Sequence, residues 1–311
     1  MIDTSKSIRK VTYEGVEIPL KGSGGEDTLT AFFNNTLETV TDTTDLYPYK
    51  FFNKYSIKHI EVNSNVAETA NYAFFGCSAI ESGTITANLG ATGGIGNYGF
   101  NSLGRFAEAS TLKINANVSI TSSFCQYAIF DEANFKSSST TIKATSARNA
   151  FANCTANKLT ITNCNTLGPF NSGLYAIGYL SSIGKVYLPD LAVIGSYGVR
   201  GLGKIFLKRT SCTLSSAKND VGATDTIFIP YTAIDNYSQA TNWTSLFTND
   251  GADEAKIFVW EEFTSGETLP TQIGTTQVYN VTWYEDDGFT TQASGTATDT
   301  KEYYGKISAV V

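Results

Sequence analysis

The sequence predicts a β-rich repeat solenoid, a fold in which one short unit is stacked many times. Two observations support this prediction. Short apolar segments alternate with turns rich in Gly and Asn, and a motif of Ala or Gly followed by an aromatic residue recurs along the chain. The aligned apolar positions recur at intervals of 24 to 27 residues, at Phe74, Phe100, Phe124, Phe151, Tyr175 and Val199. Such a period is typical of stacked units, because one unit cannot bury its apolar face alone.

The strand of each unit is predicted from a short apolar segment. The clearest unit is 186–199, where Val-Tyr-Leu-Pro is followed by a turn and then by Ile-Gly-Ser-Tyr-Gly-Val. Units of about 25 residues each contribute one strand to a stacked parallel sheet. The predicted strands are 57–62, 84–87, 112–115, 141–144, 159–162, 185–188, 204–207 and 226–229.

Two kinds of segment connect these units with a known family. Segments 73–80 and 150–154 read Ala-Phe-Phe-Gly-Cys-Ser-Ala-Ile and Ala-Phe-Ala-Asn-Cys, and segment 227–243 places Tyr237 and Trp243 after an Ile-Pro strand. They resemble the repeat and the capping segment of the BspA-like leucine-rich repeats. The resemblance covers residues 55–250 and implies a leucine-rich-repeat solenoid of about seven irregular coils, with Tyr237 and Trp243 docking the cap.

The two ends of the chain do not repeat. Residues 9–13 and 16–20 alternate apolar with polar around Glu14-Gly15 and predict a hairpin, and a helix is predicted from Asp27 to Leu37. Segments 256–260, 277–284 and 301–310 predict a small antiparallel β-module. We therefore divide the chain into a hairpin-helix cap or attachment piece (1–50), a solenoid with its cap segment (51–250) and a β-module (251–311).

Composition limits the partners. The chain has 22 Lys and Arg against 29 Asp and Glu, a net charge of −7, and no basic run, which disfavours nucleic acid and anionic membranes. No apolar segment is long enough to enter a bilayer, and the N-terminus lacks the apolar segment of a secretory signal. Five cysteines include Cys77 and Cys154 at one repeat position, which favours buried reduced thiols over the alternatives of disulfides or metal ligands.

The sequence contains few candidate catalytic residues. His59 is the single histidine, and Gly-x-Ser-x-Gly and Cys-x-x-Cys motifs are absent. Two acidic groups could bind calcium or act as a glycosidase pair, but their spacing favours solvated turns. They are Asp250, Asp253, Glu254, Glu261 and Glu262, and the run Glu285-Asp286-Asp287. We therefore expect no enzyme activity, no cofactor and no bound metal.

Aromatic residues are the better candidates for binding, since tyrosine and tryptophan offer broad contact area with a polar group. Tyrosines at or near the repeated core position could form a recognition face, or could simply pack between coils; they are Tyr72, Tyr98, Tyr127, Tyr175 and Tyr197. The β-module has more aromatic surface than so short a segment is expected to bury alone, which predicts an assembly surface. Its residues are Trp260, Trp283, Tyr303 and Tyr304.

The sequence therefore predicts a non-enzymatic binding or structural protein. Segments 281–288 and 302–306 resemble extensions beside such repeats in phage and prophage structural proteins. The resemblance implies a virion component (tail-fibre, baseplate or decoration), made in the cytoplasm, that forms a homo-oligomer. Its partners would be a protein or glycan on a host surface, or other virion proteins. The alternatives are a bacterial cell-surface adhesin and a glycan-active enzyme with carboxylates on the solenoid.

Overall fold

The computed structural model describes residues 10–13, 16–19, 39–43, 45–66, 69–89, 94–143, 147, 149–169, 182–199, 201–215, 225–248 and 256–310. Near the N-terminus, β1 (Lys10–Tyr13) pairs with β2 (Val16–Pro19) in an antiparallel ladder, as the hairpin prediction requires. The helix predicted from Asp27 to Leu37 lies outside the described residues, as do Tyr175, Asp250, Asp253 and Glu254.

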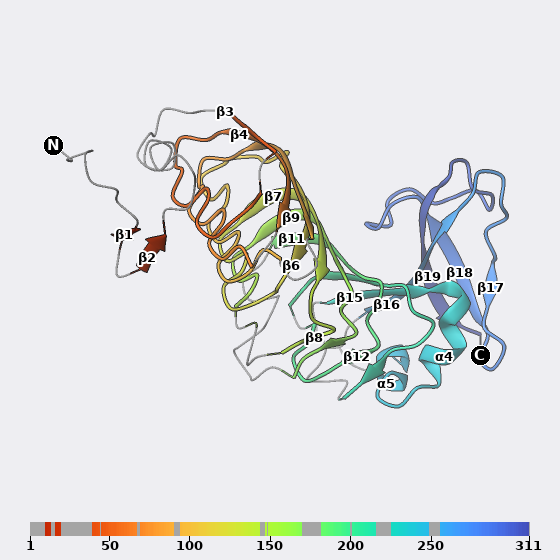
Figure 1. Ribbon diagram of the computed structural model, residues 1–311. Helices are drawn as coiled ribbons and strands as arrows, with labels where there is room; N and C mark the ends of the chain where they lie inside the picture. The colour runs from red at the N-terminus through yellow and green to blue at the C-terminus, as the bar shows by residue number, and fades with distance from the viewer. Residues whose placement is uncertain are drawn as a thin grey trace, which may run out of the picture.

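The described chain is mostly β, and its main element is one large sheet of 13 strands (Figure 1). From β3 to β16, neighbouring strands of this sheet all pair in parallel. This arrangement is compatible with a β-rich solenoid, in which each unit adds one strand to a growing sheet. The parallel strands are β3 (Thr39–Asp42), β4 (His59–Val66), β5 (Ser82–Leu89), β6 (Lys113–Val118), β7 (Ile129–Ser137), β9 (Thr155–Thr162), β11 (Ser182–Leu188), β13 (Lys204–Leu207), β15 (Thr226–Pro230) and β16 (Lys256–Phe263).

A second, four-stranded parallel sheet lies on another side of the units. Its strands are β8 (Thr141–Ile142), β10 (Thr166–Leu167), β12 (Val193–Ile194) and β14 (Thr213–Leu214). The strand predicted at 141–144 therefore belongs to this small sheet. The large sheet instead receives β7, which the sequence analysis did not predict, because Asp131 and Glu132 interrupt its apolar alternation and are poor strand formers.

Six turns in the described residues each pass through two left-handed residues that are four positions apart. The first of the two has φ between 53° and 63° at Tyr49, Tyr72, Tyr98, Ser123, Asn149 and Tyr197. The second has φ between 54° and 81° at Asn53, Gly76, Ser102, Tyr127, Asn153 and Gly201. Left-handed backbone is uncommon for residues with a Cβ, so its recurrence at fixed places defines the register of the units.

The inward side of the large sheet packs against the turns through a continuous apolar core. Phe51, Phe74 and Phe100, each two residues after a left-handed tyrosine, stack with ring centroids 5.2 and 5.4 Å apart. The aligned core positions that the structure describes are all fully buried: Phe74, Phe100, Phe124, Phe151 and Val199. Burial of these side chains is thus as the sequence predicts.

The alignment of Phe124, however, is wrong by one residue. The amide of Phe74 donates to the carbonyl of Gly99, and the amide of Phe100 donates to the carbonyl of Phe124, so Gly99 and Phe124 are equivalent. Cys125 takes the core position in this unit, and Phe135 of β7 stacks on Phe100 with centroids 5.6 Å apart. A ring from the sheet therefore fills the space that a smaller turn residue leaves.

The C-terminal strands continue the large sheet. After β16, the strands β19 (Lys301–Ala309), β18 (Tyr279–Tyr284) and β17 (Gln272–Ile273) follow in antiparallel order, at the end of the molecule opposite β3 (Figure 1). These strands include the three segments from which a small antiparallel β-module is predicted. The first of them, β16, is also hydrogen-bonded to β15 in parallel, from Thr226 opposite Lys256 to Pro230 opposite Trp260. Backbone hydrogen bonds thus join this part to the repeats.

In the part of the chain that the structure describes, helices are few and short. η1 (Tyr231–Ala233), α4 (Ile234–Ser238) and α5 (Thr244–Thr248) lie between β15 and β16. None of the helices in the described residues has both the length and the apolar character needed to cross a bilayer.

Candidate binding surface

The outward side of the large sheet carries polar side chains in rows that cross the strands. Paired register positions on β4, β5, β6, β7 and β9 place amides and hydroxyls side by side: Asn63, Thr86, Asn115, Asn134 and Thr160. The side-chain amide of Asn134 donates to Oδ1 of Asn115 over 2.9 Å, and both residues are exposed. The row is therefore an accessible line of hydrogen-bond donors and acceptors.

A second outward row lies two residues nearer the start of each strand. Glu61, Thr84, Lys113, Glu132 and Lys158 are its members on β4 to β9, and Lys185 and Lys204 extend it onto β11 and β13. Both rows face away from the core, because adjacent residues of a strand point to opposite sides of the sheet.

From β11 onward the first row becomes aromatic. Tyr187, Phe206, Phe228 and Phe258 occupy the positions that follow Thr160. The rings of Tyr187 and Phe206 stack at 4.6 Å, and those of Phe206 and Phe228 at 4.4 Å. With Trp260 and Tyr304, these rings form a second apolar cluster on the outward side. The polar face thus extends from β4 to β9 and ends where the aromatic rings begin.

The connection between β18 and β19 covers this aromatic cluster. Phe289 lies 4.5 Å from the ring of Phe258, and Asp287 pairs with Lys185 at 3.6 Å and with Lys204 at 3.1 Å. The connection therefore fastens the C-terminal strands to strands that precede them by about a hundred positions along the chain.

Glu302 connects two tyrosines of the covered cluster. The hydroxyl of Tyr187 donates to Oε2 of Glu302 over 2.7 Å, and that of Tyr304 donates to the same oxygen over 2.6 Å. Nζ of Lys185 donates to the Tyr304 hydroxyl over 2.9 Å. Burial, and then the hydrogen bond to Glu302, raise the pKa of Tyr187 and Tyr304 well above the ordinary tyrosine value. Both phenols therefore act as neutral donors.

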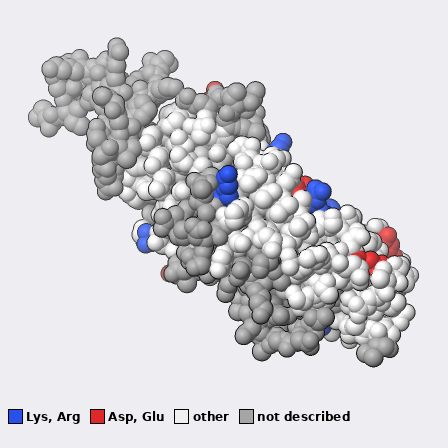
Figure 2. All heavy atoms as spheres, turned by 90° about the horizontal axis from the view of Figure 1, so that it is seen from below, with Lys and Arg blue, Asp and Glu red and all other residues white. Residues whose placement is uncertain are grey.

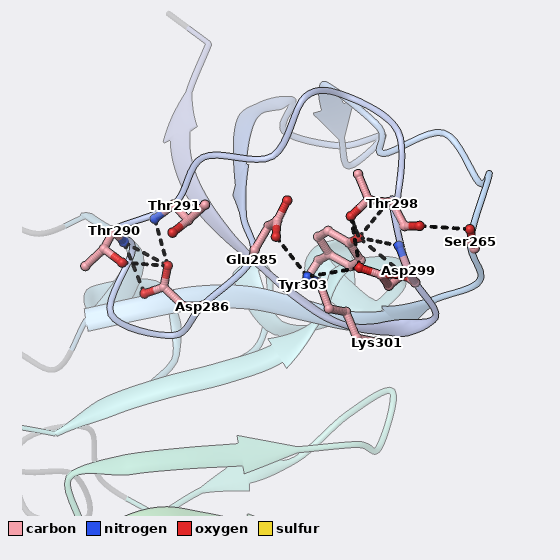
Figure 3. A network of polar contacts seen from close by, with 9 residues as sticks. All are labelled: Ser265, Glu285, Asp286, Thr290, Thr291, Thr298, Asp299, Lys301 and Tyr303. Carbon is pink, nitrogen blue, oxygen red and sulfur yellow. Dashed lines mark hydrogen bonds and ion pairs between the residues drawn. The ribbon is translucent and has the colours of Figure 1, made fainter.

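Acidic residues of the C-terminal strands and their connections bond to backbone amides and to a lysine of the same segment (Figure 3). The carboxylate of Asp286 accepts hydrogen bonds from the amides of Thr290 and Thr291, and Lys301 pairs with Glu285 at 2.8 Å. The backbone amides, despite partial burial of the carboxylate, hold the pKa of Asp286 at about 2. The run Glu285-Asp286-Asp287 consequently forms an ordered, internally bonded turn.

The predicted tyrosines that the structure describes do not form one surface. Tyr72 and Tyr98 lie in adjacent units and stack at 5.1 Å, and Tyr72 stacks at 4.9 Å on Tyr49, which the sequence analysis missed. Both faces of the Tyr72 ring are therefore covered by neighbouring tyrosines, and all three side chains are half-buried. Tyr197 occupies the same left-handed position farther along and packs against the core. The signal for Tyr49 was present, since Tyr49-Lys-Phe-Phe-Asn53 repeats the pattern of residues 72–76.

Tyr127 lies elsewhere, at the second left-handed position. Its side chain is exposed, and the guanidinium of Arg105 lies 4.7 Å from its ring centroid. Phe106, beside Arg105, has 74% of its surface exposed. These residues are accessible, but they are separate from the tyrosine stack.

Tyr237 and Trp243 hold the helical cap against the preceding unit. Both are fully buried, with ring centroids 4.7 Å apart in an edge-to-face contact. The Tyr237 hydroxyl donates to the carbonyl of Arg209 over 3.0 Å, and the Trp243 indole donates to the carbonyl of Cys212 over 2.6 Å.

The aromatic residues for which we expected an assembly role are buried within the chain. Trp260, Trp283, Tyr303 and Tyr304 all expose less than a tenth of their surface. Trp260 and Tyr304 belong to the outward cluster, and Trp283 and Tyr303 belong to the main core. The expected surface is not formed by these rings, because the sheet continues into the C-terminal strands and shares its core with them.

The described residues contain no cluster of three or more His, Cys, Asp or Glu that could hold a metal. Glu261 and Glu262 are adjacent on β16 and point to opposite sides of the sheet. Nδ1 of His59 lies 3.0 Å from Oγ of Ser82, and Nε2 lies 3.4 Å from Glu61. All five cysteines are free and buried.

A cavity of about 300 Å³ opens beside α5 and the C-terminal strands. Its lining is mostly apolar and contains no carboxylate, imidazole or thiol: Leu246, Phe247, Ile257, Phe258, Tyr279, Ile307, Ser308 and Ala309. Its chemistry therefore offers no nucleophile or general base apart from the weak Ser308 and Tyr279 hydroxyls.

Comparison of the chain with protein-family descriptions, with curated proteins and with solved structures finds no match. The geometry of the outward face is therefore the basis on which a function is proposed.

Proposed function

We propose that the protein is a non-enzymatic binding protein whose outward sheet face, from β4 to β9, holds a glycan. The observation that carries the proposal is the row from Asn63 to Thr160, in which Asn63, Asn115 and Asn134 are exposed and the last two are hydrogen-bonded to each other. Amides and hydroxyls both donate and accept, so they suit the hydroxyl groups of a sugar chain. A row that crosses five strands suits an extended ligand rather than a small molecule.

We also propose that the repeats are of the BspA-like leucine-rich type. The support is the Ala-Phe-x-x-Cys step of residues 73–77 and 150–154, together with left-handed turn residues that recur every 23 to 26 positions from Tyr49 to Asn149. Repeats of this length fall within the leucine-rich range.

In this proposal the protein is a phage or prophage virion component (tail-fibre, baseplate or decoration) that contacts a host surface and assembles as a homo-oligomer. A bacterial cell-surface adhesin is the alternative. Antibody against the purified protein distinguishes them, since it should label purified virions under the proposal and intact bacterial cells under the alternative. Light scattering of the purified chain tests the oligomer separately.

The binding proposal is tested on an array of cell-surface polysaccharides. We expect the double variant Asn115→Ala/Asn134→Ala to bind the recognised polysaccharide about thirtyfold more weakly, because each of the two lost hydrogen bonds contributes on the order of 1 kcal/mol. Thr232→Ala/Gln239→Ala is the matched control, since both side chains are exposed polar groups of the cap. Absence of any glycan binding by the wild-type protein, or unchanged binding by the first double variant, would contradict the proposal.

A further inference from the structure

Three lysines surround the centre of the polar row. Lys113 and Lys158 lie on the strands that flank β7, at the register of Glu132, and Lys136 lies on β7 itself, two residues after Asn134. Strands are about 4.8 Å apart and alternate residues about 6.7 Å apart, so each lysine Cα lies within about 8 Å of the Asn134 Cα. Lys113 and Lys136 are exposed, and Lys158 is half-buried.

These lysines differ from their neighbours in the same row. Lys185 and Lys204 are both paired with Asp287. In the described part of the chain, no carboxylate lies within ion-pair distance of Lys113, Lys136 or Lys158. The ammonium of Lys158 lies 4.9 Å from the Tyr187 ring, at the border of the aromatic cluster.

Two carboxylates lie near the three lysines. Glu132 shares the row with Lys113 and Lys158, and Asp131 accepts a hydrogen bond from the amide of Asn157 over 2.8 Å. The centre of the face therefore carries a net positive charge in a chain whose total charge is −7. On the face drawn in Figure 2, most of the described surface is neutral and the charged side chains are scattered.

We infer that the ligand of the outward face is an anionic glycan, a sugar chain with carboxylate or phosphate groups. Its charges lie near Lys113, Lys136 and Lys158, while its hydroxyl groups bond to Asn115 and Asn134. The inference rests on the proposed function and adds the charge class of the ligand. Lys113 and Lys158 are two strands apart, about 10 Å, so successive charged sugars of one chain can reach both.

The observations favour a glycan over a nucleic acid. Single-stranded nucleic acids are held by closely spaced positive charges together with aromatic rings on which bases stack. The described outward side chains of β4 to β9 include no aromatic ring other than His59. The negative total charge of the chain also repels a polyanion at long range, whereas a few local contacts suffice for a glycan of low charge density.

The test measures binding of the full chain to polygalacturonate, to the same polymer with its carboxylates reduced to alcohols, to a glycerol-phosphate teichoic acid and to a single-stranded DNA oligonucleotide. The variant is Lys113→Gln/Lys136→Gln/Lys158→Gln. The matched control removes three exposed charges elsewhere, Lys143→Gln/Lys208→Gln/Arg209→Gln. Thermal unfolding verifies that both variants fold as the wild type does.

We expect the wild-type chain to bind at least one of the two anionic polymers more tightly than the reduced polymer. The triple variant should bind that anionic polymer roughly tenfold more weakly, and the control should bind it as the wild type does. The preferred polymer identifies the anionic group, carboxylate or phosphate. Tighter binding of DNA, or equal loss in the control variant, would overturn the inference.

Failure of the inference differs from failure of the proposed function. If the reduced polymer binds as well as the anionic ones, and Asn115→Ala/Asn134→Ala weakens it, the glycan surface stands and its anionic preference is refuted. If neither the anionic polymers, the reduced polymer nor any polysaccharide of the array binds, the proposed function itself is refuted.

Discussion

The indole of Trp260 donates a hydrogen bond of 2.9 Å to the main-chain carbonyl of Leu207, which lies two strands away in the large sheet. The side chain thus passes over β15 and joins the first of the C-terminal strands to the repeats. Its ring contacts Tyr187 and Phe206 edge to face.

The substitution Trp260→Ala should therefore destabilise the whole chain. We expect a loss of about 3–5 kcal/mol in the free energy of unfolding, since a buried indole, its cavity and its hydrogen bond are lost together. Urea unfolding followed by circular dichroism measures this value. Tyr55→Ala, at an exposed ring, serves as the control. A chain that lacks 256–310 should aggregate, because it exposes Phe228 and the edge of β15.

The stacked phenylalanines of the core predict a second result. Phe74→Ala should lower the free energy of unfolding by about 3–5 kcal/mol, because the ring is fully buried between Phe51 and Phe100. Phe106→Ala removes the same ring from an exposed site and should change stability by less than about 0.5 kcal/mol. Equal effects of the two substitutions in urea unfolding would contradict the placement of these rings.

The cysteines provide a chemical test. Burial raises the pKa of the Cys77, Cys164 and Cys212 thiols to about 12, and raises those of Cys125 and Cys154 as well. A protonated, buried thiol is a poor nucleophile. We expect a thiol reagent at pH 8 to modify none of the five in the native chain and all five after denaturation without reductant. Fewer than five reactive thiols in the denatured chain would reveal a disulfide.

The covered tyrosines predict a loss of stability at alkaline pH. The pKa values of Tyr187 and Tyr304 are raised in the folded chain, so the unfolded chain releases these protons first, near pH 10. Their contribution is complete below that pH and decreases as pH rises above it. The free energy of unfolding should therefore fall above pH 10, and Tyr187→Phe/Tyr304→Phe should make the fall shallower. The free energy of unfolding is measured by denaturant titrations at several pH values from pH 8 to pH 11. If it falls with pH as steeply in the double variant as in the wild type, this expectation is contradicted.

Local patterns in the sequence predict much of this fold. The recurring short apolar segments locate β4, β6, β9 and β11 to within a few residues, and the Pro230–Trp243 segment indicates a capping element. These features depend on residues close together in the chain, where strand and turn preferences apply directly.

The missed features depend on contacts between units. In sequence, Phe124 resembles Phe100. The hydrogen bonds between turns show, however, that Cys125 is the residue equivalent to Phe100. The outward polar row could not be recognised either, because Asn134 belongs to β7, the strand whose Asp131 and Glu132 obscure its alternation. Which side chains form a row across a sheet depends on the register of every strand. If one strand is not predicted, the row cannot be predicted either.

The pairing of Asp287 with Lys185 and Lys204 limits where repeat units can be inserted into or deleted from this chain. Each inserted or deleted unit shifts later strands by about 4.8 Å along the sheet. A unit gained or lost before β11 moves the aspartate and both lysines together, so the contact survives. A unit gained between β13 and β16 would separate Asp287 from its lysines and uncover the aromatic rings beneath. Homologous proteins should therefore differ in the number of units on the N-terminal side, while the number of strands in the C-terminal third stays constant.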